Sequence, residues 1–156
     1  MSHARDRKAG FTLVELLIVV MILAILAAVV IPQINNASAE AKESALRASL
    51  ATVRQAISLY RVQHNEAYPG LGGWDEFVTQ LTAGTDPAGN PGTKYGPYLR
   101  TGFPDNPVTD SADGTVVGVM PAAAPGGTAW IYSTDVGELR ANVVGTAPSG
   151  TSFFDL

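Results

Sequence analysis

The stretch "KAGFTLVELLIVV" (residues 8–20) places a carboxylate inside an otherwise apolar run. From Phe11 to Ile31 the chain has 21 residues, and only Thr12 and Glu15 among them are polar. At a rise of 1.5 Å per residue such a helix is about 31 Å long, which is enough to cross the core of a bilayer. A carboxylate near the middle of a membrane helix costs about 2.5 to 3.5 kcal/mol, so Glu15 requires an explanation.

The charges around the apolar run predict its orientation. Arg5, Arg7 and Lys8 precede it with only Asp6 against them, and no basic residue follows before Lys42. Because basic residues stay on the cytoplasmic side, we expect a cytoplasmic N-terminus and a C-terminal domain across the membrane.

Two other readings of the apolar run are open. A buried helix of a soluble protein is disfavoured, because a domain this small does not enclose a helix that is apolar all round. A conventional signal peptide has a shorter apolar region and a cleavage site of small residues. "AILAAVVIPQ" (residues 24–33) offers small residues, but the sequence after it favours a continuing helix.

Composition limits the function. The chain has 156 residues, a formal net charge of -4 and no cysteine. That length holds one modest domain besides a membrane segment. The acidic balance gives no basic surface for nucleic acid, and the absence of cysteine excludes disulfides and thiolate zinc sites.

Glycine and proline divide the chain into two parts. No glycine lies between Gly10 and Gly70, and Pro32 is the only proline before Pro69. This distribution predicts one long helix followed by a turn-rich part.

The long helix changes character along its length. Residues 11–34 form the membrane segment, and residues 35–66 carry an apolar stripe at helical spacing. The stripe consists of Leu46, Leu50, Val53, Ile57 and Tyr60. It spans barely two heptads, so packing on a sheet is favoured over a coiled coil. Arg47, Arg54 and Arg61 recur on another face, which we expect to be solvated.

Residues 67–156 predict a globular α+β part. "WDEFVTQLT" (residues 74–82) predicts a short helix with its apolar side chains on one side. Strands are expected near 115–120, 128–133 and 138–145, the last two joined as a hairpin. The expected fold is therefore one long helix packed on a small antiparallel sheet.

The segment "GFTLVELLIVVMILAILAAVVIPQ" (residues 10–33) resembles the N-terminus of type IV pilins and of the pseudopilins of type II secretion. The resemblance covers residues 8 to about 60, and its motif is specific. It implies that residues 1–10 are a leader, that prepilin peptidase cleaves between Gly10 and Phe11, and that the Phe11 amine is then methylated. The apolar helix would remain as the polymerisation element of a helical filament.

The resemblance also gives Glu15 a partner. Cleavage creates an ammonium at Phe11, and the family implies that Glu15 of a neighbouring subunit pairs with it and fixes the axial stagger. A pair within one chain is also open, because positions i and i+4 share a helix face. A glutamate that snorkels to the interface is the third alternative. Pro32 lacks an N–H and weakens the helix, either as a tolerated kink or as a segment that melts to let subunits pack.

A shorter resemblance concerns "YGPYLRTGFPDNPVTD" (residues 95–110), which is similar to the loop after the helix in the major pseudopilin. The tryptophan-glycine-asparagine run that often follows this loop is not found, so the choice between major and minor subunit stays open. Type IV pilins commonly carry a C-terminal disulfide loop, and its absence favours a pseudopilin.

Catalytic and metal-binding chemistry is weakly represented. His64 would be the only histidine of the mature chain, and no Ser-His-Asp spacing, HExxH or phosphate loop is found. We therefore expect no enzyme and no resident cofactor. Asp105, Asp110 and Asp113 are weak calcium candidates, because the family's major pseudopilins bind calcium in C-terminal loops. The full Asp-x-Asp-x-Asp-Gly loop is missing, and turn formation explains these residues better.

These observations favour a pseudopilus subunit that drives type II secretion. A type IV pilus subunit for adhesion, motility or DNA uptake is the first alternative, and a membrane-anchored binding or enzyme domain is the second. The expected partners are prepilin peptidase, other pseudopilins, the inner-membrane assembly platform and the membrane itself. The expected location is the bacterial inner membrane, in a single pass with a periplasmic C-terminal domain, and then a periplasmic filament.

Overall fold

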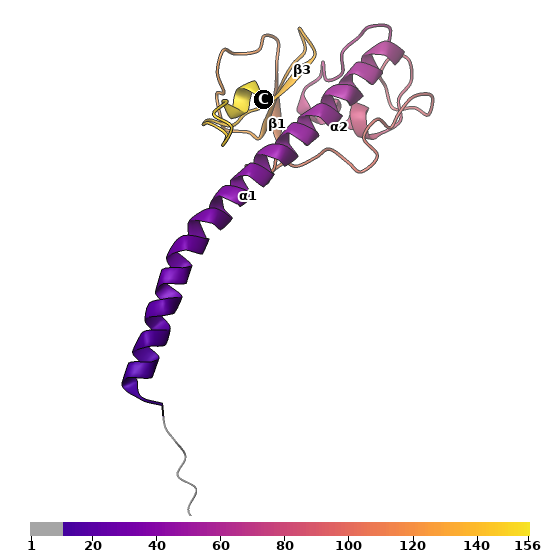
Figure 1. Ribbon diagram of the computed structural model, residues 1–156. Helices are drawn as coiled ribbons and strands as arrows, with labels where there is room; N and C mark the ends of the chain where they lie inside the picture. The colour runs from indigo at the N-terminus through magenta and orange to yellow at the C-terminus, as the bar shows by residue number, and fades with distance from the viewer. Residues whose placement is uncertain (1–10) are drawn as a thin grey trace, which may run out of the picture. The chain divides into compact units, whose positions relative to one another are not determined.

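The structure is a computed structural model that describes residues 11–156; the expected leader, including Gly10, lies outside them. The elements in chain order are α1 Leu13–Gln63, α2 Trp74–Thr82, β1 Gly114–Val117, β2 Trp130–Ser133, β3 Glu138–Ala141 and the 3₁₀ turn η1 Phe153–Asp155 (Figure 1). The chain divides into two compact units with the boundary in the sequence between Ser38 and Ala39, and α1 contributes residues to both.

Helix α1 ends at Gln63, a few residues before the expected end at position 66. The backbone N–H of His64 still donates to the Tyr60 carbonyl at 2.9 Å. Asn65 and Glu66 then have φ angles of 55° and 66°. This left-handed backbone is a common way to terminate a helix.

The predicted apolar stripe of α1 forms one side of the core of the C-terminal unit. None of its five side chains is more than 3% exposed: Leu46, Leu50, Val53, Ile57 and Tyr60. They pack with Phe77 of α2 and with Trp130, Tyr132 and Leu139 of the sheet. Fully burying a side chain of this kind contributes about 1.5 to 3 kcal/mol, so the stripe holds the helix on the sheet. The expected helix-on-sheet architecture is confirmed.

The sheet is mixed, which corrects the expectation of an antiparallel one. Its order is β1-β2-β3. The expected hairpin of β2 and β3 is antiparallel, with Tyr132 opposite Leu139. In contrast, β1 pairs parallel to β2, with Val116 opposite Tyr132. The chain between them, residues 118–129, is long enough for the crossover that parallel strands require.

The short helix and the strands lie where the sequence predicts them, but the strands are shorter than predicted. Helix α2 covers the residues expected for it, and each strand has four residues, fewer than expected. Just after β3, the Asn142 N–H still donates to the Ala129 carbonyl at 2.9 Å, and its side chain binds the segment at Gly126. Its Oδ1 accepts from the Gly126 N–H at 2.9 Å, and its Nδ2 donates to the Gly126 carbonyl at 3.0 Å.

Arg54 corrects the expectation of a solvated arginine face. Its guanidinium is partly buried and donates to the Leu139 carbonyl from Nε at 3.1 Å and from Nη2 at 2.9 Å. Nη1 donates to the Leu156 carbonyl at 3.1 Å. Arg54 thus ties α1 to β3 and to the last residue of the chain. The sequence pattern did not show this, because an arginine on a helix gives no sign of a carbonyl that faces it.

A second contact joins α1 to the C-terminal loop. Glu43, which is 7% exposed, accepts from the Ser149 N–H at 3.0 Å and from Arg47 Nη2 at 2.8 Å. The side chain of Ser149 and then that of Arg47 lower the pKa of the Glu43 carboxyl below its usual value by hydrogen bonding, and the Ser149 N–H adds to this effect. The loop around Ser149 is therefore held by a charged form of Glu43.

Candidate assembly site

Thr12 and Glu15 together cap the N-terminal end of α1. The backbone N–H and the hydroxyl of Thr12 both donate to Glu15 Oε2 at 2.8 Å, and the Glu15 N–H donates back to Thr12 Oγ1 at 3.2 Å. Thr12 immediately precedes the first helical residue, Leu13. This reciprocal arrangement is a capping box, in which two backbone N–H groups at the start of a helix are satisfied by side chains three residues apart.

Thr12 is a site residue that the sequence reasoning missed. The signal was present, because threonine followed three residues later by glutamate before an apolar run is the capping-box pattern. Thr12 was considered only as an interruption of the apolar run and as part of the family motif, and Glu15 was considered either as a partner of Phe11 or as a snorkelling side chain.

The first half of α1 presents its apolar side chains outward. Phe11 is 84% exposed, and the large apolar side chains from Leu13 to Ile31 are 47% to 83% exposed. One helix of the described chain, α1, is long and apolar enough to cross a membrane. Surfaces of this size on water-soluble proteins mark contacts with a membrane or another protein.

The other expected assembly residues are placed as follows. The backbone of α1 is helical through Pro32. Gly10, on the leader side of the expected cleavage site, lies outside the described residues. Cleavage, methylation of Phe11 and pairing of Phe11 with Glu15 between subunits are events beyond a single unprocessed chain, and they stay predictions.

The acidic cluster does not form a metal-binding arrangement in the part of the chain that the structure describes. Asp113 accepts from the Ser111 hydroxyl at 2.5 Å and from the Ala129 N–H at 3.0 Å. Asp110 lies 3.8 Å from Lys42 Nζ. Within residues 11–156, no group of three or more His, Cys, Asp and Glu side chains is placed to hold a metal ion, so Asp105, Asp110 and Asp113 are not brought together.

His64 has a structural environment. It is 3% exposed and stacks on Tyr60 with ring centroids 3.7 Å apart. Its Nδ1 lies 2.8 Å from the Tyr60 carbonyl, and its Nε2 lies 3.1 Å from Thr85 Oγ1. Because a carbonyl only accepts, Nδ1 carries a proton and donates it. Both ring nitrogens are therefore engaged within the fold.

The N-terminal sequence matches a known family, and about half of the chain matches known proteins. The family described as "Prokaryotic N-terminal methylation motif" matches residues 5–31. The chain is 35% identical over 84 residues to the "Type II secretion system core protein G" of Pseudomonas aeruginosa, which covers 53% of this chain and 58% of that protein. It is 30% identical over 83 residues to the protein of the same name from Aeromonas hydrophila, covering 53% and 58%.

A second group of relatives has a different name. The "Type IV major fimbrial protein FimA" of Dichelobacter nodosus is 39% identical over 85 residues, covering 53% of this chain and 54% of that protein. The chain thus spans a little over half the length of the curated relatives it matches. No solved structure matches.

The capped apolar helix and the helix-on-sheet unit give an α+β fold of the pilin-like class, and the N-terminal part matches the methylation motif. Within that class, the chain is homologous to core protein G of type II secretion systems and to type IV fimbrial proteins. Neither name is that of an enzyme. The motif and the long apolar helix fit a pseudopilin anchored in the inner membrane.

Proposed function

We propose that this chain is a structural subunit of a type II secretion pseudopilus. The observation that carries the proposal is the first half of α1, whose large apolar side chains from Leu13 to Ile31 are exposed and whose first turn holds a carboxylate. A helix that served only as an anchor would use Glu15 only to cap its first turn, which engages one carboxylate oxygen, Oε2. In a bundle of identical helices, Glu15 is the group that neutralises the ammonium of a neighbour.

The proposed pathway begins in the inner membrane, with the N-terminus in the cytoplasm and the C-terminal unit in the periplasm. Prepilin peptidase cleaves after Gly10, the Phe11 amine is methylated, and the subunit joins a helical filament with other pseudopilins at the assembly platform. Removing one partner of a buried ion pair costs about 3 to 5 kcal/mol, so pairing of Phe11 with Glu15 favours one stagger of the helices. No catalytic step is assigned to the chain.

Intact-mass analysis of protein from the native membrane tests the proposed processing. The expected mature chain begins at Phe11 and carries a methyl group on its amine. Retention of the leader in cells with an active prepilin peptidase, or cleavage near Ala28, would overturn the proposal.

A type IV pilus subunit is the second candidate, favoured by 39% identity to a fimbrial protein over 85 residues. The absence of cysteine speaks for the pseudopilus, because type IV pilins commonly carry a C-terminal disulfide loop. Deleting the gene separates the two. A defect in secretion with normal surface pili supports the pseudopilus, whereas loss of surface pili with normal secretion supports the pilus.

A further inference from the structure

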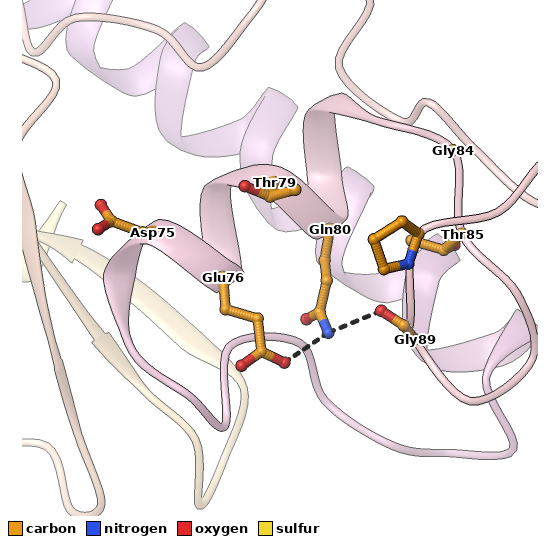
Figure 2. A pocket seen from close by; sticks show the side chains of 8 residues that line it. Asp75, Glu76, Thr79, Gln80, Gly84, Thr85 and Gly89 are labelled. Atoms are coloured by element: carbon orange, nitrogen blue, oxygen red, sulfur yellow. Dashed lines mark hydrogen bonds between the residues drawn. The ribbon is translucent and has the colours of Figure 1, made fainter.

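We draw no further inference here: the strongest candidate, the cavity of about 230 Å³ between α2 and the loop from Gly84 to Pro91 (Figure 2), carries nothing, because its acidic pair, Asp75 and Glu76, lies in the first turn of a helix and is supported only by hydrogen bonds within the cluster, and no observation on residues 11–156 shows what would fill it.

Discussion

The N–H and the hydroxyl of Thr12 donate to the same oxygen of Glu15, Oε2, at 2.8 Å each. Within residues 11–156, the structure gives the other carboxylate oxygen, Oε1, no hydrogen bond. The capping box thus satisfies half of the carboxylate inside one subunit, which lowers the cost of a carboxylate in lipid. Oε1 is therefore the oxygen that we propose pairs with the Phe11 ammonium of a neighbouring subunit.

The capping box predicts the effect of changing Thr12. Thr12→Val keeps the shape of the side chain but removes the oxygen that caps the helix, so the first turn of α1 should lose about 1 kcal/mol. Amide hydrogen exchange of the Glu15 N–H, which donates to the Thr12 hydroxyl, should then be about fivefold faster in detergent. Thr12→Ser is the control and should keep the protection. Equal exchange in the valine variant would show that the hydroxyl does not cap the helix.

Arg54 offers a test of the C-terminal unit. Arg54→Met keeps an apolar stem but removes the donors to the Leu139 carbonyl. A buried acceptor that loses its partner costs about 1 to 3 kcal/mol. Denaturant unfolding of the full chain in detergent should show this loss, while Arg100→Met, which changes an exposed arginine, should show none. An unchanged midpoint for Arg54→Met would mean that apolar packing alone holds α1 on β3.

Glu43 predicts a dependence of stability on pH. Its hydrogen bonds with Ser149 and Arg47 lower its pKa in the folded chain below the ordinary value of 4.5. The unfolded chain therefore binds the proton more readily, and the stabilisation is present above 4.5 and lost as the pH falls through the lowered pKa. We expect the Tm of the native chain to fall more steeply below pH 4.5 than that of Glu43→Gln. Parallel curves for the two would remove Glu43 as the cause.

Calcium provides a further test. Asp110 and Asp113 have protein partners and are not gathered into a metal-binding group, so we expect calcium to leave the Tm of the full chain in detergent nearly unchanged. A specific site would add about 2.7 kcal/mol at a hundredfold excess of calcium over Kd. A clear rise in Tm that Asp110→Ala abolishes would establish a site in this loop.

Local patterns in the sequence predicted the elements that depend on them. The apolar stripe from Leu46 to Tyr60 follows the helical period, and its burial was predicted correctly. Helix α2 follows from a short run with one apolar side. The direction of β1 was wrong, because strand propensity does not say which edge of a neighbour a strand will join, and only the long connection of residues 118–129 hinted at a crossover.

The candidate assembly site was predicted only in part. Glu15 stands out because lipid makes a carboxylate costly, so its importance was visible from composition alone. Thr12 was missed although its spacing to Glu15 is a known helix-start pattern. Arg54 donates to the Leu139 carbonyl, which lies 85 residues further along the chain, and Gln80 donates to the Gly89 carbonyl in the loop after α2. No local sequence pattern predicts either hydrogen bond.

The central claim, that Glu15 serves subunit assembly, is tested most directly by filament yield for Glu15→Leu. The substitution removes a charge from lipid, so the subunit should insert and be cleaved at Gly10 as before. Each Phe11 ammonium would then enter the filament without its carboxylate, at a cost of about 3 to 5 kcal/mol per subunit. We predict that filaments under overexpression fail to form or are sharply reduced, with Glu15→Asp intermediate and processed subunit in the membrane as the control. Normal filaments from Glu15→Leu would contradict the account and show that the apolar helix alone sets the register.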